Sequence, residues 1–383
     1  MPRAPHFAAA TRAMPGAVFS PIAGRMADVP GGVCPLHVGD TWREPCVGAR
    51  MEDLHEAELP GLHRYADTRG RPELVEAIVE KARARNRIPC DPEDVLVTAG
   101  ATGALGASLG AIASPGDEVL VLAPFWPLIR GIVEAFRATP VEVPFFDRVH
   151  GASDAVAALR EKTTSRTVAL YVSTPSNPTG RVLPSDWLEA IAEWAASQGL
   201  WLLADEVYED YVYRGEHVSI ARFVPERTLS VFSFSKAYGM AGNRVGYLVG
   251  PAAAVAEARK ISTHTFYAAP TAGQLAGLRA LEGGDAWIAE SRAAYQRIGD
   301  ATAARLGVPA PQGATYHFVD VASRLDERGV WGFLEDCVGQ GVALAPGPSC
   351  GQGYDTWVRL CYTAAPPEQV EDAVARVATL LGR

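Results

Sequence analysis

The sequence lacks several features that would point to particular classes of protein. It has no apolar run of about 18 residues, so no transmembrane helix is expected. The first residues, MPRAPHFAAATRAMPGAVFSPIAG, contain no continuous apolar stretch of the kind found in signal peptides. There is no dense run of Lys and Arg, and the net charge is −9, which argues against nucleic acids and anionic membranes as partners. We therefore expect a cytoplasmic protein.

The cysteines lack the spacing of a disulfide framework or a zinc site. No CxxC pair occurs, and the six cysteines are scattered along the chain at Cys34, Cys46, Cys90, Cys337, Cys350 and Cys361. This pattern favours free thiols in a reducing compartment, and no metal site is predicted.

The length and the apolar pattern predict an α/β protein of more than one domain. The chain has 383 residues and is 48% hydrophobic, enough for two cores. From about residue 70 to 275, helical and strand patterns alternate, as in βα units around a mostly parallel sheet. The apolar runs that predict strands are 95–98, 118–123, 168–172, 200–204, 229–233 and 245–249. A helix is expected from about Ser185 to Gln198, with Ser185 as its N-cap and Gly199 as its stop.

The pattern changes in the last hundred residues. A helix over about 286–306 is followed by shorter strands and by a terminal helix that begins after Pro366 and Pro367. We expect an N-terminal arm and part of a small domain over residues 1–45, a large domain over 46–280, and a small C-terminal domain over 281–383.

Lys236 is the most informative residue. The chain has only four lysines, and only Lys236 follows an apolar strand, whereas Lys81, Lys162 and Lys260 lie beside charged neighbours. An amine that forms a Schiff base must lose its proton near neutral pH, and partial burial at a strand end favours that loss. Ser233, Ser235 and Arg244 can bind a phosphate dianion. The segment suggests pyridoxal phosphate; a surface lysine in a glycine-rich loop is the alternative.

Other strand ends carry suggestive residues, and ligands of open α/β sheets bind at such ends. After 95–98 comes AGATGALGASLG, whose amides at Gly100, Ala101 and Thr102 can hold a phosphate. Thr102 can equally be a helix N-cap. After 118–123 come Phe125 and Trp126, on which a flat ring can stack, although core packing is the simpler explanation.

Two further strand ends carry polar side chains. After 168–172, the segment STPSNPTG presents Asn177 as a neutral donor, although a loop asparagine often serves only the turn. After 200–204 come Asp205 and Tyr208. A carboxylate there can hold a protonated pyridine nitrogen, and the tyrosine can bind the ring's phenolic oxygen. A helix N-cap is the alternative role for Asp205.

With these motifs in this order, the sequence resembles the class I/II aminotransferases of the fold type I pyridoxal-phosphate enzymes, from about Leu36 to the C-terminus. The resemblance implies an α/β fold: a large domain with a mostly parallel seven-stranded sheet flanked by helices, plus a smaller α/β domain. It implies that Lys236 forms the Schiff base and shuttles protons, while Asp205 pairs with the pyridinium nitrogen. Asn177 and Tyr208 would contact the ring oxygen.

The resemblance also implies the remaining site residues. The phosphate would be bound around Gly100 by Ala101, Thr102, Ser233, Ser235 and Arg244. Trp126 would stack on the ring, with Phe125 as the alternative. In YADTRGRPELVEAI, Tyr65 is similar to a tyrosine that reaches the phosphate of the neighbouring subunit, which implies a homodimer. Gly39, Asn177 and Arg359 would bind the substrate, and the arginine fork suits its carboxylate.

The sequence departs from the family pattern in two places that commonly decide specificity. Cys350 stands where an aromatic residue is common, and His37, Trp42 and Arg43 replace apolar or acidic residues. An aromatic pocket formed by Trp42, Phe125, Tyr267 and Cys350, recruitment of an acidic side chain by Arg43, and core packing or loop cover are all open interpretations.

The expected activity is transfer of an amino group between an L-amino acid and a 2-oxo acid. A pyridoxal-phosphate-dependent carbon–sulfur β-lyase, or another such enzyme of the same fold, is the alternative. A cofactor-binding regulatory module is a third possibility, but residues 1–60 show neither a helix-turn-helix nor a basic face.

Overall fold

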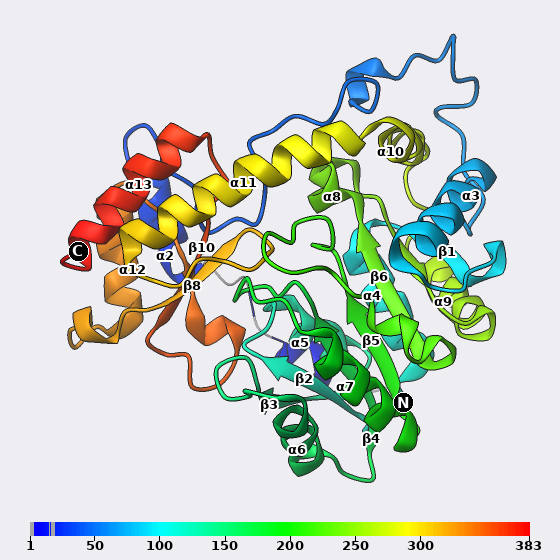
Figure 1. Cartoon of the computed structure of the whole chain (residues 1–383), viewed down its shortest axis with the longest axis horizontal. Coiled ribbons are helices and arrows are strands. Elements are labelled where there is room, and N and C mark those ends of the chain that lie inside the picture. The colour runs from blue at the N-terminus through cyan, green and yellow to red at the C-terminus, as the bar shows by residue number, and fades with distance from the viewer. Residues whose placement is uncertain (1–3, 15, 17–19) are drawn as a thin grey trace.

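A seven-stranded sheet forms the centre of the molecule, and a three-stranded sheet lies to one side of it (Figure 1). The computed structural model describes residues 4–14, 16 and 20–383. The strands are β1 Val95–Thr98, β2 Glu118–Ala123, β3 Thr139–Pro144, β4 Thr167–Ser173, β5 Trp201–Asp205, β6 Thr228–Ser233, β7 Gly246–Val249, β8 Tyr316–Asp320, β9 Ala345–Pro346 and β10 Trp357–Cys361. The helices are α1 Ala9–Ala13, α2 Ser20–Ala27, α3 Pro72–Lys81, α4 Gly100–Ile112, α5 Leu128–Ala135, α6 Ala152–Lys162, α7 Ser185–Ser197, α8 Phe234–Ala237, α9 Ala252–Thr265, α10 Thr271–Gly283, α11 Asp285–Leu306, α12 Gly329–Gly339 and α13 Pro367–Leu380.

The large sheet has the strand order β1-β7-β6-β5-β4-β2-β3. Strands β2 to β6 pair in parallel, and β7 runs antiparallel to β6 and β1. Helices cover both faces, so the inner strands are buried throughout and read as continuous apolar runs in the sequence. The predicted mostly parallel seven-stranded sheet is confirmed.

The strand that sequence analysis missed is β3, whose residues TPVEVP include two prolines. Proline cannot donate a backbone hydrogen bond, so it is tolerated mainly in strands at the edge of a sheet. Strand β3 lies at that edge, beside β2. The proline pattern therefore hid an edge strand.

Helix α7 shows where the local prediction succeeded and where it was wrong. Gly199, with φ +73°, follows the end of the helix and provides the predicted stop. Ser185 is not the N-cap, because the cap position is occupied by Pro184 and no side chain caps the first turn. A proline with an extended backbone therefore begins this helix.

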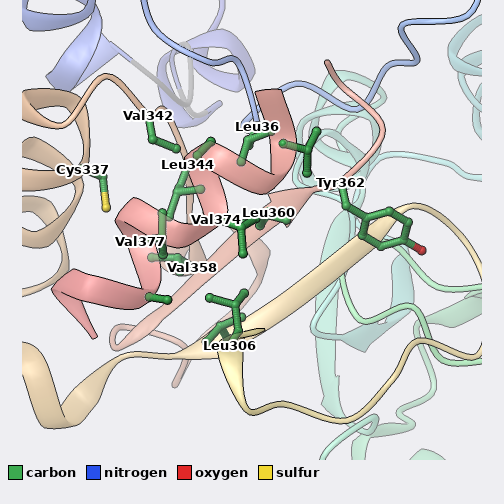
Figure 2. Packing of buried hydrophobic residues seen from close by; sticks show 14 of the residues in the cluster. Leu36, Leu306, Cys337, Val342, Leu344, Val358, Leu360, Tyr362, Val374 and Val377 are labelled. Carbon is green, nitrogen blue, oxygen red and sulfur yellow. The ribbon is translucent and has the colours of Figure 1, made fainter. Parts of the chain in front are cut away.

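The small sheet, in the order β8-β10-β9, is covered by α2, α11, α12 and α13 (Figure 1). Its core joins Val358 and Leu360 of β10 to Val374 and Val377 of α13 (Figure 2). Leu36 belongs to the same core, so this part of the N-terminal region packs with the small sheet. The boundaries at residues 45 and 280 stay predictions.

Two general properties of the chain complete the fold. Within the described ranges, no helix is long and apolar enough to cross a membrane. All six cysteines lie in the described part of the chain, and each is a free thiol.

Candidate active site

A cavity of about 190 Å³ lies between the large sheet and the small sheet. The ends of β5 and β6, the start of α4 and the loops after β2 and β4 line one side of it, and Gly39, Tyr316 and Arg359 line the other. The sequence-predicted residues that line it are Gly39, Ala101, Thr102, Trp126, Asn177, Asp205, Tyr208, Ser233, Ser235, Lys236, Arg244 and Arg359. The fold thus brings together residues that are separated by more than three hundred positions in the sequence.

Lys236 lies on the short helix α8, directly after β6. Ser233 caps this helix, since its hydroxyl accepts a hydrogen bond of 3.1 Å from the amide of Ser235. The Lys236 ammonium donates to the carbonyl oxygen of Gly39. Burial lowers the pKa of Lys236, and Arg359 and Arg244 add to this effect. The amine is therefore easier to deprotonate than an exposed lysine, as nucleophilic chemistry requires.

Asp205 is the last residue of β5 and is only 5% exposed. Its Oδ2 accepts a hydrogen bond of 2.5 Å from the Tyr171 hydroxyl. Burial raises the pKa of Asp205 to about 6, and the bond from Tyr171 opposes that rise. No helix begins directly after β5, so Asp205 is not a helix N-cap. A buried carboxylate at this position suits a cationic partner in the cavity.

Another group of residues that line the cavity suits an anion. A Cβ on Gly246 would lie 2.6 Å from the amide nitrogen of Ala101, so glycine is required beside the start of α4. A Cβ on Gly100 would lie 2.6 Å from Arg244 Nη2, although Gly100 itself does not line the cavity. Helix α4 begins at Gly100, so Thr102 lies within its first turn and is not the N-cap. Helix amides and a guanidinium together fit a phosphate group.

Arg359 of β10 is 6% exposed and faces Asn177. Its Nη1 donates to Asn177 Oδ1 at 3.1 Å, and its Nη2 donates to the carbonyl oxygen of His37 at 2.7 Å. The guanidinium carbon lies 4.7 Å from the centre of the Tyr316 ring. Its buried Nε has no hydrogen-bond partner within the described part of the chain. Two hydrogen bonds thus hold the Arg359 guanidinium in place, and its Nε–H remains as a donor for a ligand.

Tyr208 and Tyr316 are hydrogen-bonded to each other in the cavity. Their hydroxyls lie 2.5 Å apart, and both side chains are buried. A Cβ on Gly39 would lie 2.0 Å from the Tyr316 hydroxyl oxygen, which explains why glycine stands there. Since each hydroxyl can donate as well as accept, the pair can offer one proton to a ligand oxygen.

Some predicted residues lie away from this cavity. Tyr65 is 88% exposed and packs its ring at 5.1 Å from that of Tyr267, outside the cavity of its own chain. Phe125 is buried in the large-domain core, so Trp126 is the aromatic residue available to a flat ring. Cys350 is also fully buried and does not line the cavity.

The positions that depart from the family pattern near residue 40 are engaged elsewhere. The Trp42 ring packs against Tyr295 at 5.4 Å. Arg43 forms a 3.2 Å ion pair with Glu290 and lies over the ring of Trp287. Neither side chain lines the cavity, so packing accounts for both in this chain.

Sequence reasoning missed Tyr171, which supports Asp205, and Tyr316, which lines the cavity. Tyr171 left a usable signal, because it is the one hydroxyl-bearing ring in an otherwise apolar central strand, and a buried phenol needs a partner. Tyr316 lies in a short strand of the other domain, and only the tertiary fold brings it to the site.

Comparison with known proteins gives a consistent result. The profile of the family "Aminotransferase class I and II" matches residues 36–377. The aspartate/prephenate aminotransferase of Thermus thermophilus is 36% identical over 343 residues, which is 87% of each chain. The aspartate aminotransferase of Streptomyces avermitilis is 34% identical, over 84% of this chain and 82% of that protein.

Solved structures agree with the sequence comparison. N-Succinyldiaminopimelate aminotransferase from Mycobacterium tuberculosis superposes with a TM-score of 0.89 at 29% identity, covering 98% of this chain and all of that one. A Thermus thermophilus aspartate aminotransferase double mutant also gives a TM-score of 0.89, at 32% identity and with the same coverage.

Proposed function

Because the chain belongs to the aminotransferase class I and II family, we propose that its cavity holds pyridoxal phosphate and that it moves an amino group from an L-amino acid to a 2-oxo acid. The observation that carries the proposal is that a partly buried lysine, a buried carboxylate, an anion cradle and a fixed arginine line one cavity. Lys236, Asp205, Arg244 and Arg359 are these residues. Family membership alone would leave their roles open.

The cavity residues suit both the phosphate and the ring of the cofactor. Ala101, Thr102, Ser233, Ser235 and Arg244 would hold its phosphate, and Asp205 would hold its ring nitrogen. Asn177 and Tyr208 would bind the ring oxygen, and Trp126 would cover the ring. When bound, the group supplies an aldehyde for the lysine and a ring that accepts negative charge from the substrate.

The chain's own residues perform the remaining tasks. Arg359 binds the substrate carboxylate, since two of its nitrogens are already fixed and its Nε is unused. Lys236 Nζ, once neutral, would take the proton from the substrate α-carbon and return it to the aldehyde-derived carbon of the cofactor, on the far side of the substrate nitrogen. Asp205 stays ionised beside the ring nitrogen and keeps that nitrogen protonated. Tyr208 and Tyr316, both buried, form one wall of the cavity and place their hydroxyls there as hydrogen-bonding groups.

Acidic amino acids are the first substrates to test. One relative is named for aspartate and prephenate and another for N-succinyldiaminopimelate, all of which carry additional carboxylates. Arg43, the candidate for an acidic side chain, is paired with Glu290 in this chain. A screen of the twenty amino acids for conversion of the bound cofactor to its amine form decides between acidic and aromatic preference.

We also propose that the enzyme is a homodimer. Tyr65 is 88% exposed and Tyr267 is 46% exposed, and the two rings are in contact. A tyrosine that extends outward in this way can reach the phosphate site of a second copy. Sedimentation should give twice the mass of one chain.

Replacing Lys236 tests the function directly. Lys236→Ala should abolish the absorbance of the Schiff base between the lysine and pyridoxal phosphate and lower the turnover by at least about 10²–10⁴-fold. Lys260→Ala is the matched control, because Lys260 is exposed and forms a surface ion pair with Glu257. An unchanged spectrum in Lys236→Ala would refute the proposal. Release of ammonia from cystathionine without an added oxo acid would instead indicate a carbon–sulfur lyase.

A further inference from the structure

We propose that Tyr171 is a positioning residue that fixes the Asp205 carboxylate for the ring nitrogen of the cofactor, an inference that rests on the proposed function. The Tyr171 hydroxyl donates to Asp205 Oδ2 at 2.5 Å. Tyr171 does not line the cavity, so it acts on the cofactor only through Asp205.

The two residues meet because of the register of the large sheet. Strands β4 and β5 are parallel neighbours, in which Tyr171 pairs with Leu203, and Ser173 pairs with Asp205. Side chains two positions apart on a strand share a face, so Tyr171 and Asp205 point to the same side. A tyrosine side chain is long enough to span that two-residue offset.

The surroundings of Tyr171 show that its hydroxyl is not there for packing. The residue is 1% exposed and lies in an apolar cluster that includes Leu105, Leu203 and Val231. Phenylalanine would fill nearly the same volume without bringing a polar atom into this core. A buried hydroxyl is costly unless it is hydrogen-bonded, and Asp205 supplies the acceptor.

The bond also decides which oxygen of Asp205 remains for a ligand. Oδ2 is engaged by Tyr171, whereas among the described residues Oδ1 has only a long contact of 3.4 Å from the amide of Val207. Asp205 lines the cavity. Tyr171 thus fixes the rotation of the carboxylate and leaves Oδ1 to accept a proton-bearing ring nitrogen, in the way that supporting residues orient metal and cofactor ligands.

The test removes pyridoxal phosphate from wild type and from Tyr171→Phe and then titrates it back to measure its dissociation constant for each protein. The dissociation constant of the cofactor should rise about ten- to hundredfold, the usual effect of losing a buried hydrogen bond to a charged group. The ¹⁵N chemical shift of ring-labelled cofactor should move toward the unprotonated value. Tyr171→Met removes the same hydroxyl with a different side chain, so the two variants must agree.

Two controls separate positioning from general damage to the core. Tyr238→Phe removes another hydroxyl that is buried and has no partner within the described part of the chain, and it should leave the dissociation constant unchanged. In an Asp205→Ala background, which leaves Tyr171 no side-chain acceptor at position 205, Tyr171→Phe should produce no further loss of affinity, because its effect passes through the Asp205 side chain.

The outcomes are distinguishable. If wild type itself does not bind pyridoxal phosphate, the proposed function fails. If wild type binds and both Tyr171 variants match it in affinity and in ¹⁵N shift, only the role of Tyr171 is refuted. An equal loss of affinity in the presence and absence of the Asp205 carboxylate also refutes that role.

Discussion

The replacement Asp205→Asn should stabilise the cofactor-free chain against unfolding while abolishing its aminotransferase activity. Burial raises the pKa of Asp205 from 3.8 to about 6. In the folded chain without cofactor, the ionised carboxylate is therefore disfavoured relative to the unfolded chain. Asparagine has nearly the same shape, carries no charge and can still accept the hydrogen bond from Tyr171.

The magnitude follows from linkage between proton binding and folding. Because the folded pKa lies above the unfolded one, the folded chain binds more protons, and wild-type stability falls as the pH rises between about 4 and 6. At pH 8 the difference of roughly two pKa units corresponds to about 3 kcal/mol. At pH 4.5 it shrinks to about 1 kcal/mol, because the carboxyl of the folded chain is then mostly protonated.

Urea unfolding of the cofactor-free proteins, followed by circular dichroism at both pH values, measures this difference. Asp355→Asn is the control, because Asp355 is exposed and has no ion pair among the described residues. A gain in Asp205→Asn that is the same at pH 4.5 and pH 8 would contradict the reasoning, since a packing effect does not follow the ionisation of a carboxyl. A variant less stable than wild type at pH 8 would contradict it outright.

Three further predictions concern other parts of the site. Arg359→Lys should raise KM for the amino acid about ten- to hundredfold, as measured by steady-state kinetics. The reason is that an ammonium group lacks the planar set of donors with which a guanidinium binds a carboxylate. Gly246→Ala should weaken cofactor binding about tenfold or more in a titration, since its Cβ would lie 2.6 Å from the Ala101 amide, whereas Gly106→Ala, with open space around its Cβ, should not. Tyr65→Phe should weaken cofactor binding in a titration with no change in monomer stability. If Tyr65 acts across the interface, a hybrid dimer of one Tyr65→Phe chain and one Lys236→Ala chain should bind the cofactor normally in one of its two sites.

The strands and their functional ends were accessible from local sequence. Buried parallel strands are apolar on both faces, so β2 and β6 stand out as continuous runs, and the polar residues directly after them mark the ligand edge. Strand β3 was hidden because proline breaks the expected strand pattern but is tolerated at an edge. The prediction of Ser185 as the N-cap of α7 was wrong because Pro184 occupies that position.

Arg359 shows the opposite case. Its local sequence, WVRLCY, reads as an edge-strand arginine, and only the resemblance to a family suggested a role. The fold buries it beside Asn177 and the His37 carbonyl, which fixes two of its nitrogens. No pattern within the strand predicts those partners, since they come from segments 182 and 322 residues away.

The sequence by itself predicted most strands of the large sheet and singled out Lys236 as the candidate Schiff-base lysine, because burial on a strand and the residue type after it are local properties. Tertiary structure alone decided how those groups are tuned. The pKa of Lys236 falls because the fold partly buries the amine, with Arg359 and Arg244 nearby, and Asp205 accepts a hydrogen bond because a tyrosine from the neighbouring strand reaches it. Charge, burial and hydrogen bonding act through space, so residues distant in the sequence set the chemistry of the site.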